Sequence, residues 1–335
     1  MTIHSVHNAT VSSGKIDGEK NTEFNEDVSL AVRAAWLHYV GGLTQTAVAK
    51  RLGLPSVKAH RLISRAVTDG VVKVTIEGSI VECAILENQL CKQFGLNFCE
   101  VAPDLGEEGA PLRALGLAGA SFLRRQIERG EHKVIGLGHG HTSSAAVRHK
   151  PRIDAGDVCF ISLLGGLTRH YSANPHDVMH SLAEKTGAQA YVMPVPFFAN
   201  SNEDREVLLA QPGVREIFNL SNGAKLKFVG IGTVKADAQL VASGMIEPKE
   251  IVDIKANGGV GELLGHFFDA KGRVLETTLT SRTFAVALDS AAQHQIVAIA
   301  GGEEIIEAIR AVLHSARISG LITDEPTAKA LVANL

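Results

Sequence analysis

A glycine-rich stretch carries the densest set of side chains that could recognise a ligand. Residues 136–144 read Gly-Leu-Gly-His-Gly-His-Thr-Ser-Ser and lead into a helical pattern. Backbone amides at a helix start, with hydroxyl and imidazole groups beside them, suit a sugar or a polyol. The candidate contacts are Gly138, His139, Gly140, His141, Thr142 and Ser143. A tight strand-to-helix turn without a ligand is the alternative. The stretch is not a dinucleotide fingerprint, because His141 stands where the third glycine belongs.

Two histidine pairs and two acidic residues raise the question of metal or enzyme chemistry. His139 and His141 are neighbours in the glycine stretch, and His176 and His180 are one helical turn apart, a spacing that can bind zinc. Neither pair has a third ligand motif, so we expect no metal and no cofactor. Glu262 and Asp269 could act as the base of an isomerase, but no partner acid, histidine or nucleophile motif accompanies them. We therefore expect a protein that is not an enzyme.

A second kind of chemistry lies near the N-terminus. Residues 43–66 contain five basic residues and no acidic one, with helix-period apolar positions on both sides of Gly53. This pattern predicts a helix-turn-helix that binds double-stranded DNA. Such a basic face is often merely solvated, but residues 27–78 hold seven basic and three acidic residues in a chain of net charge −3. The candidate DNA contacts are Thr44, Gln45, Ser56, Lys58, His60, Arg61 and Arg65.

Three helices must hold those side chains. A helix over residues 28–40 is expected to bury Val28, Val32, Ala35, Trp36, Tyr39 and Val40. Thr44 is the expected N-cap of a short second helix, and Gly53 supplies the turn. The third helix starts near Pro55 or Ser56 and turns Ala59, Leu62, Ile63 and Ala66 inward. Residues 70–78 alternate as a strand pair does, which predicts a wing.

The remainder of the chain predicts an α/β domain with a mostly parallel sheet. Apolar, β-branched runs followed by glycine and a helical stretch recur at 133–136, 158–166, 190–193, 228–232, 296–302 and 321–323. Continuously apolar strands alternating with helices indicate a sheet covered on both faces. Ligands of such sheets bind at the carboxyl ends of the strands, so the glycines locate the expected pocket.

These observations divide the 335 residues into four segments. We expect a disordered tail at 1–26, a winged helix-turn-helix at 27–78, a linker helix at 79–95 and an effector-binding domain at 96–335. Cys83, Leu86, Leu90 and Phe94 share one face of the linker helix. The four cysteines lack metal-type spacing, and no apolar run is long enough to span a membrane, which favours a cytoplasmic protein.

In combination, these motifs resemble the SorC family of bacterial sugar-responsive transcriptional regulators. The resemblance runs from about residue 28 to the C-terminus and rests on Leu43–Ile63 with Gly70–Val72, Gly136–Gly138, Leu164–Leu167, Gly259–Asp269, Ala300–Gly302 and Leu321–Ala328. It implies a winged helix-turn-helix joined to a Rossmann-like domain similar to phosphosugar isomerases, assembled as dimers or tetramers. It also implies an effector cleft lined by His141, Thr142, Asn174 and Glu262. Gly166 and Asp269, which lie in the matching motifs, are further candidate effector contacts.

Two departures from the family pattern refine this expectation. Ile305 stands where members that take sugar phosphates often have lysine, and Glu303 and Glu304 precede it, which favours an unphosphorylated sugar or sugar alcohol. Pro55-Ser56 replaces a frequent Ser-Arg, so an operator sequence cannot be borrowed from a relative. We expect a repressor of a carbohydrate or sugar-alcohol catabolic operon. A sugar-phosphate isomerase-like enzyme and a regulator responding to a phosphosugar are the alternatives.

Overall fold

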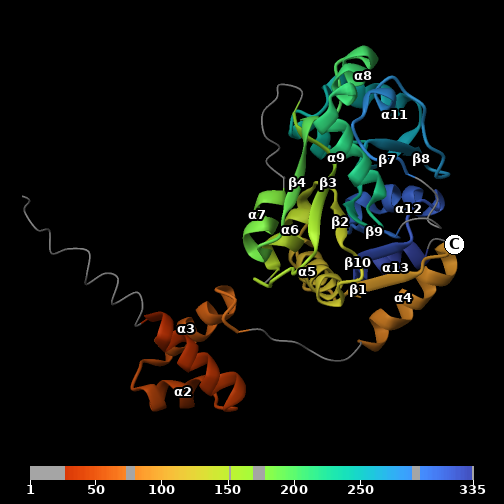
Figure 1. The fold of residues 1–335 in the computed structure, drawn as a ribbon. Helices are drawn as coiled ribbons and strands as arrows, with labels where there is room; N and C mark the ends of the chain where they lie inside the picture. The colour runs from red at the N-terminus through yellow and green to blue at the C-terminus, as the bar shows by residue number, and fades with distance from the viewer. Residues whose placement is uncertain (1–26, 73–79, 151, 169–177, 289–294, 334–335) are drawn as a thin grey trace, which may run out of the picture. The chain divides into compact units, whose positions relative to one another are not determined.

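A computed structural model describes residues 27–72, 80–150, 152–168, 178–288 and 295–333 (Figure 1). The chain divides into two compact units, residues 1–78 and 79–335. The predicted tail and most of the predicted wing, at 73–79, lie outside the described residues.

The first unit is a small helical bundle. Residues 27–35 form an α-helix that continues as the π-helical turn η1 (Trp36–Val40), followed by α2 (Gln45–Leu52) and α3 (Ser56–Thr68). Thr44 caps α2 as predicted, because its Oγ1 accepts a hydrogen bond of 3.2 Å from the Ala47 amide. Gly53 ends α2 in the left-handed conformation, with a φ of 65° that costs glycine little. The turn between α2 and α3 is therefore built as the sequence predicts.

The buried face of the first helix shares only Ala35 with the predicted one among the residues that are fully buried. Ala31, Ala34, Ala35 and Leu37 face the core, whereas Val32, Trp36, Tyr39 and Val40 are exposed. The helix has apolar residues on two stripes, and the stripe of small residues packs on α3. Small side chains allow two helices to approach closely. The alanine-rich stripe is therefore the buried one, and the stripe with the valines and aromatic residues is exposed.

The second unit contains a seven-stranded parallel sheet in the order β1-β10-β9-β5-β2-β3-β4 (Figure 1). The strands are β1 (Phe98–Ala102), β2 (Val134–Leu137), β3 (Cys159–Leu167), β4 (Ala190–Pro196), β5 (Leu226–Gly230), β9 (Gln295–Ile299) and β10 (Gly320–Asp324). The predicted parallel sheet is confirmed, with β1 as a strand that the sequence pattern missed. A smaller antiparallel sheet, also missed, joins β6 (Gly232–Thr233), β7 (Gly259–Leu263) and β8 (His266–Asp269).

Helices cover both faces of the parallel sheet. The second unit's helices are α4 (Val81–Phe94), α5 (Leu112–Arg129), α6 (His141–His149), α7 (Met179–Thr186), α8 (Asn202–Ala210), α9 (Pro212–Gly223), α10 (Gln239–Ala242), α11 (Pro248–Ala256), α12 (Ile306–His314) and α13 (Glu325–Ala333), with short 3₁₀ turns η2 (Thr280–Arg282) and η3 (Glu303–Ile305).

The sheet's two hydrophobic cores explain its continuously apolar strands. Along β9, Val297 and Ile299 join the core under α5, α6 and α7. Ile296 and Ala298 join the core on the other side, with α4, α12 and α13. Because both faces of the sheet are buried, residues that point to either face of a strand are mostly apolar. Cys83, Leu86 and Leu90 bind α4 to this second core, as the spacing predicts. Among the described residues, no helix is long and apolar enough to cross a membrane.

Candidate functional site

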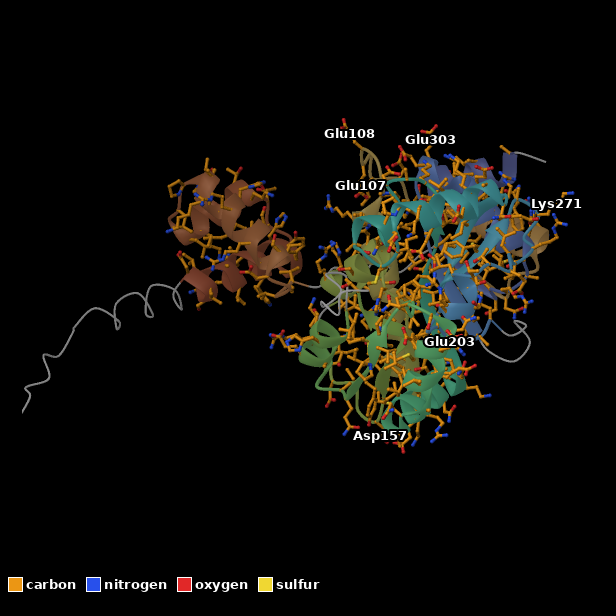
Figure 2. All side chains as sticks on the ribbon, turned by 90° about the horizontal axis from the view of Figure 1, so that it is seen from above. Glu107, Glu108, Asp157, Glu203, Lys271 and Glu303 are labelled. Atoms are coloured by element: carbon orange, nitrogen blue, oxygen red, sulfur yellow. The ribbon has the colours of Figure 1, made fainter. Side chains whose placement is uncertain are left out.

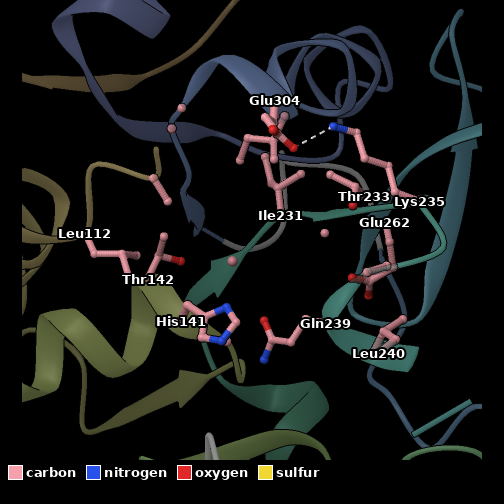
Figure 3. A pocket seen from close by; sticks show the side chains of 18 of the residues that line it. Leu112, His141, Thr142, Ile231, Thr233, Lys235, Gln239, Leu240, Glu262 and Glu304 are labelled. Carbon is pink, nitrogen blue, oxygen red and sulfur yellow. Dashed lines mark hydrogen bonds and ion pairs between the residues drawn. The ribbon is translucent and has the colours of Figure 1, made fainter. Parts of the chain in front are cut away.

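A cavity of about 820 Å³ opens at the carboxyl edge of the parallel sheet (Figure 3). Gly138 follows β2, Gly230 ends β5, Gly301 follows β9, Asp324 ends β10 and Asp104 lies just beyond β1; all five line it. The cavity therefore lies where open α/β sheets bind ligands, and its size is in the range of about 300–1,000 Å³ that small-molecule sites occupy.

The glycine stretch forms one wall of this cavity. Gly138 lies against β5, since a Cβ there would be 3.3 Å from the Val229 Cα, and Gly140 has a φ of 130° that an L side chain rarely adopts. The helix α6 then starts at His141 with no side-chain cap. Amides at the start of a helix can donate hydrogen bonds to a ligand oxygen. Thr142 holds the loop to β9, because its Oγ1 donates a hydrogen bond of 3.0 Å to the Ile299 carbonyl.

Glu262 on β7 is a buried carboxylate in the cavity wall. It is 8% exposed, and its Oε1 accepts a hydrogen bond from the Gly265 amide. A Cβ on Gly232 would lie 2.4 Å from Oε2, so the bare glycine makes room for this carboxylate. Burial raises the pKa of Glu262 to about 7, against the opposing effect of the Gly265 hydrogen bond. Near neutral pH this side chain can therefore offer a hydroxyl-rich ligand either a charged or a protonated carboxyl group.

The wall opposite the glycine stretch was missed by the sequence analysis. It comes from residues 231–245 and includes Thr233, Lys235, Gln239 and Ser243. In Figure 3 the Gln239 amide and the His141 ring point toward one another across the cavity. The only sequence signal for this segment was its position directly after a predicted strand, because α10 is a single turn without an apolar period.

The lining of the whole cavity is strongly acidic. Among the described residues its carboxylates are Asp104, Glu107, Asp237, Glu262, Glu303, Glu304 and Asp324, and Lys235 is the one lysine or arginine. Lys235 donates a hydrogen bond of 2.9 Å to Glu304, so its charge is already compensated (Figure 3). Figure 2 places Glu107 and Glu303 at the same end of the second unit, far from Asp157. Ile305 also lines the cavity. An anionic ligand would meet repulsion here.

Several of these carboxylates have structural hydrogen bonds. Glu107 accepts from the Arg113 and Ala114 amides at the start of α5, and Asp324 accepts from the Gly302 and Thr327 amides. Asp104 accepts from the Gly106 amide, and Glu304 accepts from Lys235. Of the other three acids, Asp237, Glu262 and Glu303, Glu262 is the most buried. Glu262 is therefore the strongest candidate among these acids for a hydrogen bond to a ligand inside the cavity.

The structure brings together most of the predicted effector contacts, but not all. Gly138, His139, Gly140, His141, Thr142 and Glu262 line the cavity, whereas Ser143, Gly166 and Asp269 do not. Ser143 is fully buried in α6. Asp269 instead closes the turn after β8, accepting from the Lys271 and Arg273 amides and from Arg273 Nε at 2.7 Å. Asn174 lies outside the described residues.

The predicted DNA contacts lie on α3 and at the start of α2. Ser56, Lys58, His60 and Arg61 are exposed on α3, and Ala59, Leu62, Ile63 and Ala66 are buried beneath them, as predicted. Arg65 is half-buried and pairs with Asp69 at 3.2 Å. Thr44 is exposed and Gln45 is half-buried at the start of α2. A helix with its apolar side buried and with Lys58 and Arg61 exposed suits the major groove of DNA.

The histidine pairs do not gain a third ligand in the part of the chain that the structure describes. No group of three or more histidine, cysteine, aspartate or glutamate side chains there could hold a metal ion. His139 lies 3.4 Å from the Ser162 hydroxyl, and His180 is exposed on α7. His176 lies outside the described residues.

Comparison with known proteins connects both units to one kind of protein. Residues 79–333 match the family model described as "Putative sugar-binding domain". The erythritol catabolism regulatory protein EryD of Brucella abortus is 66% identical over 306 residues, covering 91% of this chain and 97% of that protein. The transcriptional regulator LsrR of Klebsiella pneumoniae is 33% identical, covering 91% and 93%. The full-length sorbitol operon regulator SorC of Klebsiella pneumoniae superposes with a TM-score of 0.65 at 26% identity, covering 92% of this chain and 99% of that one.

Proposed function

The chain belongs to the SorC family of sugar-binding transcriptional regulators, and we propose that it represses a sugar-alcohol catabolic operon until a neutral polyol fills the cavity of its second unit. The resemblance is to regulators over nine tenths of the chain, so the isomerase alternative loses its support.

One observation carries the choice of effector: among the residues that the structure describes, the cavity wall is acidic and its one lysine is paired with Glu304. Strong recognition of a phosphate relies on cationic side chains, whereas here a dianion would lie among carboxylates. Neutral hydroxyl groups, by contrast, donate hydrogen bonds well to carboxylates. A polyol therefore fits this wall better than its phosphate does.

The similarity to EryD suggests which polyol to test first. EryD is 66% identical to this chain and its name ties it to erythritol catabolism. We therefore take a four-carbon sugar alcohol as the first effector to test. One part of the cavity is surrounded by His141, Thr142, Gln239 and Glu262 (Figure 3). These side chains would contact the hydroxyl groups of the sugar alcohol. The cavity is larger than such a molecule, which leaves room for water or a longer polyol.

The first unit would read the operator. In this proposal Lys58 and Arg61 contact DNA first, with Ser56, His60, Arg65, Thr44 and Gln45 around them. One unit offers few phosphate contacts, so specific binding needs two units on two half-sites, and the chain would act as a dimer or tetramer in the cytoplasm. An effector that favours one arrangement of the second units then shifts the spacing of the first units.

Calorimetric titration of the full-length protein tests the effector assignment. Erythritol, a five-carbon and a six-carbon sugar alcohol, and their phosphates form the panel. Glu262→Gln keeps the side-chain size but removes the charge, and Glu203→Gln makes the same change on exposed α8 as a control. We expect a neutral polyol to bind, and Glu262→Gln alone to weaken it. Binding of phosphates alone would contradict the proposal.

A further inference from the structure

An apolar face on the first helix of the first unit is left exposed by the described residues of that unit, 27–72. This first-helix face consists of Val32, Trp36, Tyr39 and Val40, with 41%, 58%, 46% and 69% exposure. The first three residues are spaced by four and three positions, as in the seam of a helix pair. Soluble surfaces rarely keep two aromatic and two aliphatic side chains open on one helix unless another surface covers them.

The opposite side of the same helix is buried in the core of the first unit. Ala31, Ala34 and Leu37 belong to one hydrophobic cluster with Leu62 and Ile63 of α3. The first-helix face therefore points away from the buried side of α3, and a protein bound to it leaves the outer side of α3 open. Covering this face and binding DNA are compatible.

We propose that a second copy of the chain covers this face, first-helix face against first-helix face, when two first units occupy neighbouring half-sites on DNA. This inference rests on the proposed function, which requires paired units. Two copies of one apolar stripe match each other by symmetry, without any further design. DNA is the wrong occupant, because Arg33 is the only lysine or arginine between residues 28 and 49 and phosphates need cations.

The size of the face explains why pairing would depend on DNA. Aromatic side chains bury ~150–250 Å² when covered completely, and valines bury less, so the exposed fractions of the four residues leave roughly 300–400 Å² per copy. A stable interface buries about 800 Å² per partner. The pair is thus too small to hold two free chains together, but it adds to binding once DNA or the second units bring the first units close. An effector that separates the first units would break it.

The protein contains its own reporter for this contact, because Trp36 is the sole tryptophan of the chain. Quenching of its fluorescence by iodide is measured on the full-length protein in three states: free, bound to the operator with two half-sites, and bound at low salt to DNA trimmed to one half-site. We expect at least about a twofold lower quenching constant on the two-site DNA only, since the core of an interface excludes solvent.

A charge variant tests the same contact through affinity. Val40→Glu places a carboxylate in the face, and Val207→Glu makes the same change on α8, where the valine is 62% exposed. We expect Val40→Glu to bind two-site DNA at least about tenfold more weakly while binding one-site DNA as the wild type does, because the added charge would be buried unpaired. Val207→Glu should match the wild type.

Each other outcome contradicts the inference. Equal quenching of Trp36 on two-site DNA and in the free protein would show an uncovered face. Protection on one-site DNA would assign the face to DNA, and protection already present in free dilute protein would assign it to another part of the chain. Unchanged two-site binding by Val40→Glu would have the same force. These results leave the proposed function standing, whereas a wild type that binds no DNA contradicts both.

Discussion

The buried carboxylate Glu262 should make the second unit less stable as the pH rises. Its pKa is raised from 4.5 to about 7 by burial, so the folded state holds the proton more tightly than the unfolded state does. The favourable contribution of the protonated form is complete below pH 4.5 and is lost as the pH rises through 7. The difference between the two pKa values corresponds to about 3 kcal/mol of unfolding free energy at pH 8.

Glu262→Gln removes this titration while keeping the side-chain shape and an oxygen that can accept from the Gly265 amide. Urea unfolding of the ligand-free protein, followed by far-ultraviolet circular dichroism at pH 5 and pH 8, measures the effect. Fluorescence of Trp36 reports the first unit separately, since that unit holds the sole tryptophan. We expect the variant to unfold with about 3 kcal/mol higher free energy than the wild type at pH 8, and with a smaller difference at pH 5.

The control is Glu203→Gln on α8, an exposed carboxylate whose pKa is lowered by its own backbone hydrogen bond and by Ser201. It should not reproduce the gain. The reasoning would be refuted by a Glu262→Gln variant that loses stability at pH 8, or that keeps the pH dependence of the wild type. Either result would mean that Glu262 is already solvated or paired in the ligand-free protein.

Three further predictions follow from other parts of the chain. Lys58→Ala and Arg61→Ala should each weaken operator binding by roughly tenfold and lower its salt dependence. Calorimetry should show an unchanged polyol affinity, and Lys271→Ala, an exposed change in the second unit, is the control. Equal loss of DNA binding and polyol binding would contradict the assignment of these two functions to separate units. Ile305→Lys should raise affinity for a phosphorylated polyol by roughly tenfold relative to the neutral one, because a cation then joins the acidic wall; no change in that ratio would mean that the phosphate binds elsewhere. Thr44→Ala should lower the unfolding free energy of the first unit by about 1 kcal/mol, followed by Trp36 fluorescence, since the Ala47 amide loses its cap; an unchanged midpoint would contradict the role of this hydrogen bond.

The sequence predicted the parts of the fold that repeat a simple pattern. The inward residues of α3, the Thr44 cap and the Gly53 turn follow from local spacing alone, and the parallel sheet follows from apolar runs that end in glycine. The glycine wall of the cavity was found for the same reason, because a strand-to-helix turn is marked by its glycines and by the polar residues after them.

What the sequence missed depends on tertiary contacts. The first helix has two apolar stripes, and only packing against α3 decides that the alanine stripe is buried and that Trp36 is exposed. The strand β1 has Glu100 at its centre, which hides its apolar pattern; Arg125 pairs with that carboxylate in the fold. Gln239 and Thr233 lie in short elements without a period, so only the folded chain brings them opposite His141. Asp269 is the opposite case: it lies in a family motif and was expected at the effector site, but its hydrogen bonds stabilise the turn after β8.

The most direct test of the account is a titration of full-length protein onto DNA from upstream of its own gene, with and without erythritol, longer sugar alcohols and their phosphates. We expect sequence-specific binding that one neutral polyol releases at concentrations where its phosphate has no effect, and that Glu262→Gln no longer releases. Binding that responds only to a phosphorylated ligand, or that no member of the panel alters, would contradict the account.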